Sequence, residues 1–204
     1  MTSIDKTTDK TYDRDYFDRW YRDSGIGGRR RLQRKVALAV STAEYHLERP
    51  LRSVLDIGCG EGVWRAPLLA LRPKARYLGF DSSEYAIRRY GARRNLNFAR
   101  FGDFGMLRPC PPVDLLICSD VLHYLPTREI DRGLPGLAEL CGGVAFLETF
   151  AKEDQTEGDN IGFRPRPERF YRQRFETAGF RFVGSHCWLS PTLAGDAAAL
   201  ELGA

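Results

Sequence analysis

The sequence predicts a doubly wound α/β domain, in which a mostly parallel sheet is covered by helices on both faces. Three observations support this prediction: short apolar segments without polar alternation, amphipathic helical segments between them, and a glycine-rich turn directly after the first apolar segment. The chain has 204 residues and is 43% hydrophobic, enough for one globular core with a modest addition. We assign the core to residues 50–204, and a tail with a helical lid to residues 1–49.

Seven segments have the short, apolar character of strands. Five of them fall in the first part of the core, and two follow near the C-terminus, close enough to pair antiparallel. They are Ser53–Ile57, Arg76–Phe80, Leu96–Phe101, Val113–Cys118, Gly143–Thr149, Phe180–Ser185 and Ala197–Leu202. The expected sheet is therefore seven-stranded and mostly parallel, with an antiparallel strand at its C-terminal end.

Helical segments lie between most of these strands. Their apolar residues recur at helical spacing, and several segments begin or end at a proline, a glycine or a capping residue. One of them contains Gly133, Pro135 and Gly136, and we expect it to break or kink there. The four helices of the core are expected at Val63–Leu71, Ser83–Arg94, Thr127–Leu140 and Pro167–Ala178.

The first 49 residues have the pattern of two helices. Tyr16, Trp20 and Tyr21 occur at helical spacing and would share one side of the first helix. Apolar residues between Leu32 and Leu47 predict a second, amphipathic helix that ends before Pro50. The aromatic residues of this lid are candidates for contact with a cofactor or a substrate. The alternative is ordinary packing against the core.

Composition and charge argue against several classes of protein. No apolar run reaches the ~18 residues that a membrane-spanning helix needs. The polar segment Met1–Lys10 is unlike a signal peptide, so we expect a cytoplasmic protein without a membrane partner. The net charge of +4 is spread along the chain, which does not favour a nucleic-acid partner. Five scattered cysteines and three histidines show no metal-ligand spacing, so no metal is expected.

The first strand leads into a glycine-rich turn, Asp56-Ile57-Gly58-Cys59-Gly60-Glu61-Gly62, and a helical pattern follows. Glycines at this place allow a tight reversal and let a ligand touch the backbone. Their spacing is Gly-x-Gly-x-Gly, whereas the dinucleotide fingerprint is Gly-x-Gly-x-x-Gly. Asp56 would repel a pyrophosphate group and attract a ligand with positive charge.

Acidic residues also follow the second and third strands, at what would be the same edge of the sheet. Asp81 stands 23 residues after Gly58, where a carboxylate can accept hydrogen bonds from both ribose hydroxyls. Asp103 can accept from an adenine amino group, while Phe104 stacks on the ring or lines it. The fourth strand runs to Ser119, and its tip would close the crevice over the reactive end of the ligand.

Four motifs, Asp-Ile-Gly-Cys-Gly-Glu-Gly, Gly-Phe-Asp, Gly-Asp-Phe and Asp-Leu-Leu-Ile-Cys-Ser-Asp-Val-Leu-His, resemble in order and spacing those of the class I S-adenosylmethionine-dependent methyltransferases. The resemblance is strongest over residues 50–150. It implies a Rossmann-like sheet, S-adenosyl-L-methionine as cofactor and a small-molecule methyl acceptor as partner. It also implies site residues: the methionine end at Asp56, Gly58 and Gly60, the ribose at Asp81, the adenine at Asp103 and Phe104, and the back of the pocket at Ser119. Ser82, beside Asp81, is a further candidate for cofactor binding.

Methyl transfer from a sulfonium is an in-line displacement that depends mainly on positioning. Where the acceptor is a hydroxyl, a general base helps, and the two candidates are His123 after the fourth strand and Glu148 at the tip of the fifth. Packing or capping roles are the alternative for both. Tyr124 is a candidate for the acceptor pocket, together with the aromatic lid and the irregular segment Ala151–Arg166, whose acidic excess favours an amine-bearing acceptor.

Three other interpretations remain open. A nicotinamide-dependent oxidoreductase has the same architecture, but the glycine spacing and the extra acid Asp103 argue against it. A base-modifying nucleic-acid methyltransferase would place Asn/Asp-Pro-Pro-aromatic after the fourth strand, where this chain has Ser119-Asp120-Val121-Leu122. A cofactor-binding module without activity is the third. We expect methyl transfer to an oxygen or nitrogen nucleophile of a small molecule.

Overall fold

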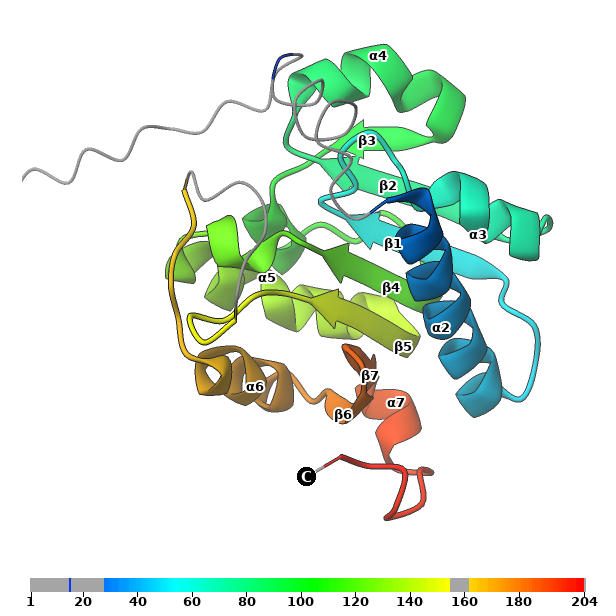
Figure 1. Cartoon of the computed structure of the whole chain (residues 1–204), viewed down its shortest axis with the longest axis vertical. Coiled ribbons are helices and arrows are strands. Elements are labelled where there is room, and N and C mark those ends of the chain that lie inside the picture. The colour runs from blue at the N-terminus through cyan, green and yellow to red at the C-terminus, as the bar shows by residue number, and fades with distance from the viewer. Residues whose placement is uncertain (1–14, 16–27, 155–161, 204) are drawn as a thin grey trace, which may run out of the picture.

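The computed structural model describes residues 15, 28–154 and 162–203 (Figure 1). Seven strands form one sheet in the order β3-β2-β1-β4-β5-β7-β6. The pairs among β1 to β5 are parallel, whereas β7 is antiparallel to both β5 and β6. The predicted fold class is therefore confirmed. The strands are β1 (Ser53–Ile57), β2 (Arg76–Asp81), β3 (Leu96–Phe98), β4 (Val113–Ser119), β5 (Cys141–Glu148), β6 (Arg181–Gly184) and β7 (Cys187–Leu189).

Helices cover both faces of the sheet, and Figure 1 shows α2 and α5 on opposite sides of it. α5 (Thr127–Leu140) and α6 (Glu168–Thr177) share one core cluster with the strands, while α2 (Arg29–Leu47) and α3 (Arg65–Leu71) share the other. The remaining helical elements are α4 (Glu84–Arg94), α7 (Pro191–Ala194) and the 3₁₀ helices η2 (Phe101–Gly105) and η3 (Leu122–Tyr124).

The central strands are apolar at successive positions because both of their faces are covered. In β4, Leu115 and Ile117 belong to the cluster under α2, and Leu116 and Cys118 belong to the cluster under α5. All four side chains are completely buried. This double burial explains the absence of polar alternation that predicted a parallel sheet.

The second helix of the N-terminal segment packs directly on the sheet. Val36, Ala39, Val40 and Ala43 are buried at helical spacing in α2, as the sequence predicts. The helix ends at Glu48, whose φ of 52° turns the chain out of the helix. The predicted first helix, which carries Tyr16, Trp20 and Tyr21, lies outside the described residues.

The prediction of a break in the helix at residues 127–140 is wrong, because α5 is continuous through Pro135. Its two glycines serve close packing against η2. A Cβ on Gly133 would lie 2.3 Å from the carbonyl oxygen of Phe101, and one on Gly136 would lie 1.8 Å from that of Phe104. The glycines therefore let helix and turn touch, and the buried apolar face of α5 keeps it helical.

Two strand predictions also need correction. The segment Ala197–Leu202 is not a strand; the last strand is β7, at Cys187–Leu189. It follows β6 after a two-residue turn. Ser185 and His186 form this turn with φ of 46° and 66°, which Asn and Gly adopt more often, so the sequence does not indicate a turn here. The third strand is shorter than expected, since η2 begins at Phe101.

All five cysteines are free thiols, and four of them are buried. Burial raises the pKa of Cys141 to about 12, so its thiol stays protonated. In the described part of the chain, no helix is long and apolar enough to cross a bilayer.

Candidate active site

The connections of the sheet reverse direction between β1 and β4. From β1 the chain passes to β2 and β3 on one side, and then to β4 and β5 on the other. Doubly wound sheets bind ligands in the crevice beyond the carboxyl ends of the strands at such a switch point. The four predicted motifs lie at this edge: the turn 58–62 after β1, Asp81 at the end of β2, Asp103 in η2 beyond β3, and Ser119 at the end of β4.

Hydrogen bonds within the protein hold the glycine-rich turn. The N–H groups of Gly58 and Cys59 both donate to the Phe80 carbonyl, at 2.8 and 3.0 Å. The N–H of Gly60 donates to Asp81 Oδ2 at 2.7 Å. Gly58 and Gly60 have φ of 71° and 53°, which only glycine adopts without penalty. Phosphate-binding loops direct such N–H groups at the ligand, whereas three of them are occupied here.

Asp81 connects the end of β2 to the glycine-rich turn and to α4. Its Oδ1 accepts a hydrogen bond from the N–H of Ser83 at 2.7 Å, while Oδ2 accepts from Gly60. Burial raises the pKa of Asp81, and these backbone N–H groups oppose the rise. Ser83 in turn caps α4 by accepting from the N–H of Ala86, and Ser82 beside it is exposed. The Asp81 carboxylate is thus fixed at the carboxyl end of β2, beside the glycine-rich turn.

Asp56 lies in β1, directly below the turn, and is 1% exposed. The hydroxyl of Tyr77, on β2, donates to Asp56 Oδ2 at 2.5 Å. Burial raises the pKa of Asp56 to about 7; the Tyr77 hydrogen bond opposes this rise and the nearby Asp81 adds to it. The carboxyl group therefore changes charge close to neutral pH. Sequence reasoning missed Tyr77, because a tyrosine inside an apolar strand has no distinguishing pattern.

The two carboxyl groups suit a ligand with positive charge. Among residues 28–154 and 162–203, no lysine or arginine forms an ion pair with Asp56 or Asp81. A cation beside them would favour their ionised forms and relieve the cost of burial. S-adenosylmethionine carries a sulfonium and an α-ammonium group, so the residues present fit this cofactor.

Asp103 and Phe104 are placed differently from each other. Asp103 is half-buried and its Oδ2 accepts from the N–H of Arg100 at 2.9 Å, which caps η2. Phe104 has no exposed surface, and its ring packs edge-on against Phe80 with the centroids 5.4 Å apart. This burial leaves no face of the Phe104 ring for stacking on a ligand, so Phe104 supports the edge of the site from within the core.

Glu148, one of the two candidates for a general base, is occupied by two partners. Lys35 Nζ, from α2, lies 2.5 Å from Oε1 and 2.7 Å from Oε2, and the Ser119 hydroxyl donates to Oε2 at 2.5 Å. Although burial acts to raise the pKa of Glu148, the hydrogen bonds from Lys35 and Ser119 hold it below its ordinary value. Glu148 thus fastens α2 to the ends of β4 and β5. Sequence reasoning missed Lys35, which resembles any solvent-facing lysine on an amphipathic helix.

His123, the other candidate base, is enclosed at the edge of the site and is 1% exposed. Its Nδ1 lies 3.2 Å from the Thr149 hydroxyl oxygen, and its Nε2 lies 3.2 Å from Asp120 Oδ1. This enclosure supports the packing role for His123 rather than direct contact with an acceptor. Three rings surround the imidazole, with centroids 4.2 to 5.5 Å away: Tyr124, Phe150 and Phe163.

The chain after β5 closes against η3. The N–H of Arg164 donates to the His123 carbonyl at 2.8 Å. Arg166 is 9% exposed, and its guanidinium donates to the carbonyls of Leu122 and Leu125, at 3.3 and 2.6 Å. Both ends of the irregular segment 151–166 are described, and its second end holds the backbone that carries His123.

The predicted acceptor residues are only partly described. Tyr124 is half-buried in η3, beside the end of β4. Tyr16, Trp20 and Tyr21 lie outside the described residues, as does the part of the irregular segment at 155–161 that holds Glu157 and Asp159. Their contact with an acceptor stays a prediction.

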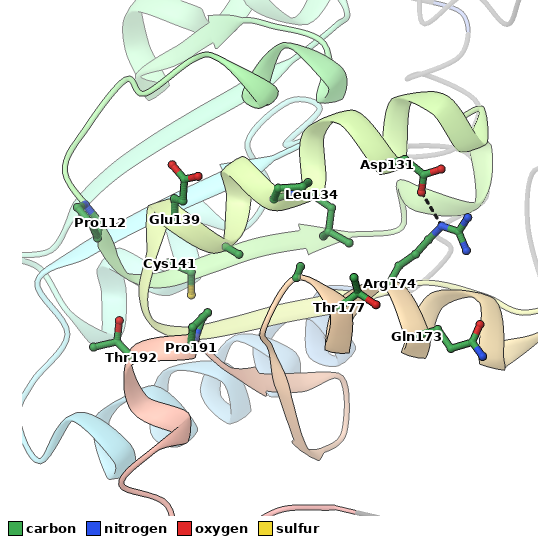
Figure 2. Close-up of a pocket in the computed structure, with 13 residues that line it drawn as sticks. Pro112, Asp131, Leu134, Glu139, Cys141, Gln173, Arg174, Thr177, Pro191 and Thr192 are labelled. Carbon is green, nitrogen blue, oxygen red and sulfur yellow. Dashed lines mark hydrogen bonds and ion pairs between the residues drawn. The ribbon is translucent and has the colours of Figure 1, made fainter.

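A cleft of about 800 Å³ lies elsewhere, among α5, α6 and α7 (Figure 2). Pro112 precedes β4 and Cys141 begins β5, so the cleft lies toward the amino ends of these strands. The ion pair of Asp131 with Arg174, at 2.7 Å, borders it. None of the motif residues lines this cleft, and we retain the switch point as the candidate site.

Comparisons with known proteins identify similar domains and folds. Residues 55–143 match a family model described as a methyltransferase domain. Trans-aconitate 2-methyltransferase of Methylobacterium nodulans is 41% identical over 86 residues, covering 41% of this chain and 32% of that protein. The protein of the same name from Deinococcus radiodurans is 40% identical over 111 residues, covering 52% and 41%. The crystal structure of Streptomyces venezuelae DesVI has a TM-score of 0.63 at 16% identity, covering 87% of this chain and 97% of that one.

The match of residues 55–143 to a methyltransferase domain confirms the resemblance to the class I S-adenosylmethionine-dependent methyltransferases that was drawn from the sequence, and the DesVI structure is similar to this chain in fold. The chain spans well under half the length of the two curated relatives, 32% and 41% of them.

Proposed function

We propose that this chain transfers a methyl group from S-adenosylmethionine to an oxygen or nitrogen nucleophile of a small molecule. The observation that carries the proposal is the acidic switch point: Asp56 and Asp81 lie there without a cationic partner among the described residues. A sulfonium cofactor supplies that charge and an activated methyl group. After transfer its sulfur is neutral, which weakens the attraction and favours release of the product.

The proposal assigns the residues at the crevice to parts of the cofactor. Asp56 and the turn at Gly58 and Gly60 hold the methionine end, with Asp56 acting through its charge because it is buried. Asp81 and Ser82 hold the ribose, Asp103 the adenine amino group, and Ser119 the back of the pocket. Glu148 and His123 position the ends of β4 and β5, since both are buried and engaged by neighbours.

Isothermal titration calorimetry with S-adenosylmethionine and S-adenosylhomocysteine tests the first half of this proposal. Binding of both is expected, and failure of both to bind would reject it. Mass spectrometry of incubations with S-adenosylmethionine tests the second half. The acceptors tested should include small amines, small alcohols and trans-aconitate, the compound that appears in the names of two relatives.

The occupied N–H groups of the glycine-rich turn distinguish this proposal from a nicotinamide-dependent oxidoreductase. A pyrophosphate group at this turn would meet Asp81, which already accepts from Gly60, and the buried Asp56. Thermal shift with NAD and NADP is expected to show no stabilisation. For a nucleic-acid methyltransferase, binding would weaken steeply with salt, and we expect methyl transfer here to be insensitive to it.

Cofactor affinity is expected to depend on pH through Asp56. Because its pKa is raised to about 7, the carboxyl group is ionised above that pH and protonated below it. A cationic ligand favours the ionised form, so the Kd should be constant above pH 7 and rise below it, by up to about tenfold per pH unit for one linked proton. Calorimetry from pH 5.5 to 8.5, which is roughly 1.5 units on either side of that pKa, measures this.

Tyr77→Phe is the matched variant for this linkage. Removal of the hydroxyl takes away the hydrogen bond that favours the Asp56 carboxylate, so the midpoint of the pH profile should move upward. A midpoint that stays in place, or a flat profile in the wild type, would disprove the role of Asp56.

A further inference from the structure

Asp120 is an acidic residue at the switch point to which no role has yet been given. It follows β4 directly, and its N–H donates to the carbonyl of Glu148 at 3.0 Å. Its φ is 64°, a left-handed conformation that is uncommon for non-glycine residues but that aspartate and asparagine adopt more readily than most. The next residue, Val121, packs against the glycine-rich turn so closely that a Cβ on Gly58 would lie 2.3 Å from it. Asp120 is therefore fixed beside the turn.

The Asp120 side chain faces solvent at this edge and is 60% exposed. Its Oδ1 lies 3.2 Å from Nε2 of the buried His123. Among the described residues, none forms a hydrogen bond or an ion pair with Oδ2. One oxygen is thus anchored and the other is available to a ligand.

The hydrogen bonds of His123 determine which ring nitrogen carries the hydrogen. The N–H of Phe150 points at Nδ1 from 3.4 Å, and a backbone N–H can only donate. Nδ1 is therefore the acceptor, and Nε2 carries the hydrogen that it donates to Asp120 Oδ1. In this tautomer both ring nitrogens of His123 are engaged, Nδ1 as an acceptor and Nε2 as the donor to Asp120. His123, the candidate base of the sequence analysis, is thus enclosed and orients Asp120, which faces outward.

We propose that Asp120 binds the methyl-accepting group, a hydroxyl or an amine, through a hydrogen bond to Oδ2, and that His123 is its positioning residue. This inference rests on the proposed function and narrows its acceptor class. A carboxylate oxygen has no hydrogen to donate, and its charge is repelled by Asp120. Donor nucleophiles are therefore favoured over carboxylic acids. The negative charges of the neighbouring Asp56 and Asp81 also disfavour a carboxylate acceptor.

The charge at this place can be measured without knowing the acceptor. Sinefungin is a cofactor analogue that bears a primary amine where S-adenosylmethionine carries its methyl group, and S-adenosylhomocysteine has no group there. The ratio of the two Kd values, S-adenosylhomocysteine over sinefungin, reports the preference for a cation in front of the cofactor. In Asp120→Asn this ratio should fall about tenfold, because a charge-assisted hydrogen bond is lost. Asparagine tolerates the left-handed conformation and keeps an acceptor for His123.

Two further variants make the result specific. Glu139→Gln removes a similarly exposed charge on α5, where Glu139 pairs with Arg108, and it should leave the ratio unchanged. His123→Leu should lower the ratio in part while S-adenosylhomocysteine affinity holds, and His123→Gln, which keeps a donor near the position of Nε2, should restore it. An unchanged ratio in Asp120→Asn overturns this inference alone. If neither ligand binds the wild type, the proposed function fails and this inference with it.

Discussion

Asp81→Ala is expected to lower the affinity for S-adenosylhomocysteine about hundredfold, which corresponds to a loss of about 2–3 kcal/mol. The variant leaves two ribose hydroxyls of the proposed ligand without their acceptor. It also releases the N–H groups of Gly60 and Ser83, which the carboxylate holds at 2.7 Å each. Both the ligand contact and the shape of the turn depend on one side chain. Calorimetry measures the loss, and the variant should retain its fold, because the contacts lie at the edge of the sheet.

A ligand without the ribose 2′-hydroxyl separates the two contributions of Asp81. For the wild type, 2′-deoxy-S-adenosylhomocysteine should bind more weakly than the parent ligand. For Asp81→Ala the two ligands should bind alike, because the hydroxyl no longer has a partner. If the two ligands still differ in affinity for Asp81→Ala, then Asp81 does not bind the ribose 2′-hydroxyl. If the variant binds S-adenosylhomocysteine with wild-type affinity, then Asp81 is not part of the cofactor site.

The edge of the sheet was predictable because its signals are local. An apolar segment followed by Gly-x-Gly, or by an aspartate such as Asp81 or Asp103, indicates the end of a strand independently of the rest of the sequence. Parallel strands bring their carboxyl ends together, so these residues had to meet. The resemblance to a known family then supplied the ligand, which the pattern of charges alone describes only as cationic.

The contacts that define the chemistry of the site depend on residues far apart in the chain. Whether His123 is open or enclosed is decided by Phe150 and Phe163, and whether Glu148 is free is decided by Lys35, on a helix 113 residues earlier. No local pattern encodes such contacts. The same holds for Asp120, whose exposure and conformation give it a role that a motif position does not reveal.

Local rules also failed where packing outweighed them. Pro135 predicted a break or a kink from its missing N–H, yet α5 is unbroken because its face is buried. The apolar run at Ala197–Leu202 predicted a strand, but β5 is already paired with the three-residue β7, whose side chains are all buried. Short strands after unusual turns have too few residues to show a period.

Gly136→Ala is expected to destabilise the protein by about 3 kcal/mol, although alanine is the better helix former by about 1 kcal/mol. The added methyl group would lie 1.8 Å from the carbonyl oxygen of Phe104 and 2.8 Å from Nη1 of Arg108. Backbone cannot yield as a flexible side chain does, so α5 and η2 must separate. Because the Asp103 carboxylate sits in η2, adenine binding should weaken as well. Urea unfolding with and without S-adenosylhomocysteine measures both effects.

Gly195→Ala is the control for that substitution. A Cβ on Gly195 meets nothing within 4 Å, and its φ of −72° suits alanine, so stability should stay within about 0.5 kcal/mol of the wild type. The difference in stability between Gly136→Ala and Gly195→Ala therefore measures the effect of the close approach of α5 to η2. If Gly136→Ala unfolds at the wild-type urea concentration, then the helix and the turn have room between them, and the position of Asp103 at the crevice does not depend on a glycine.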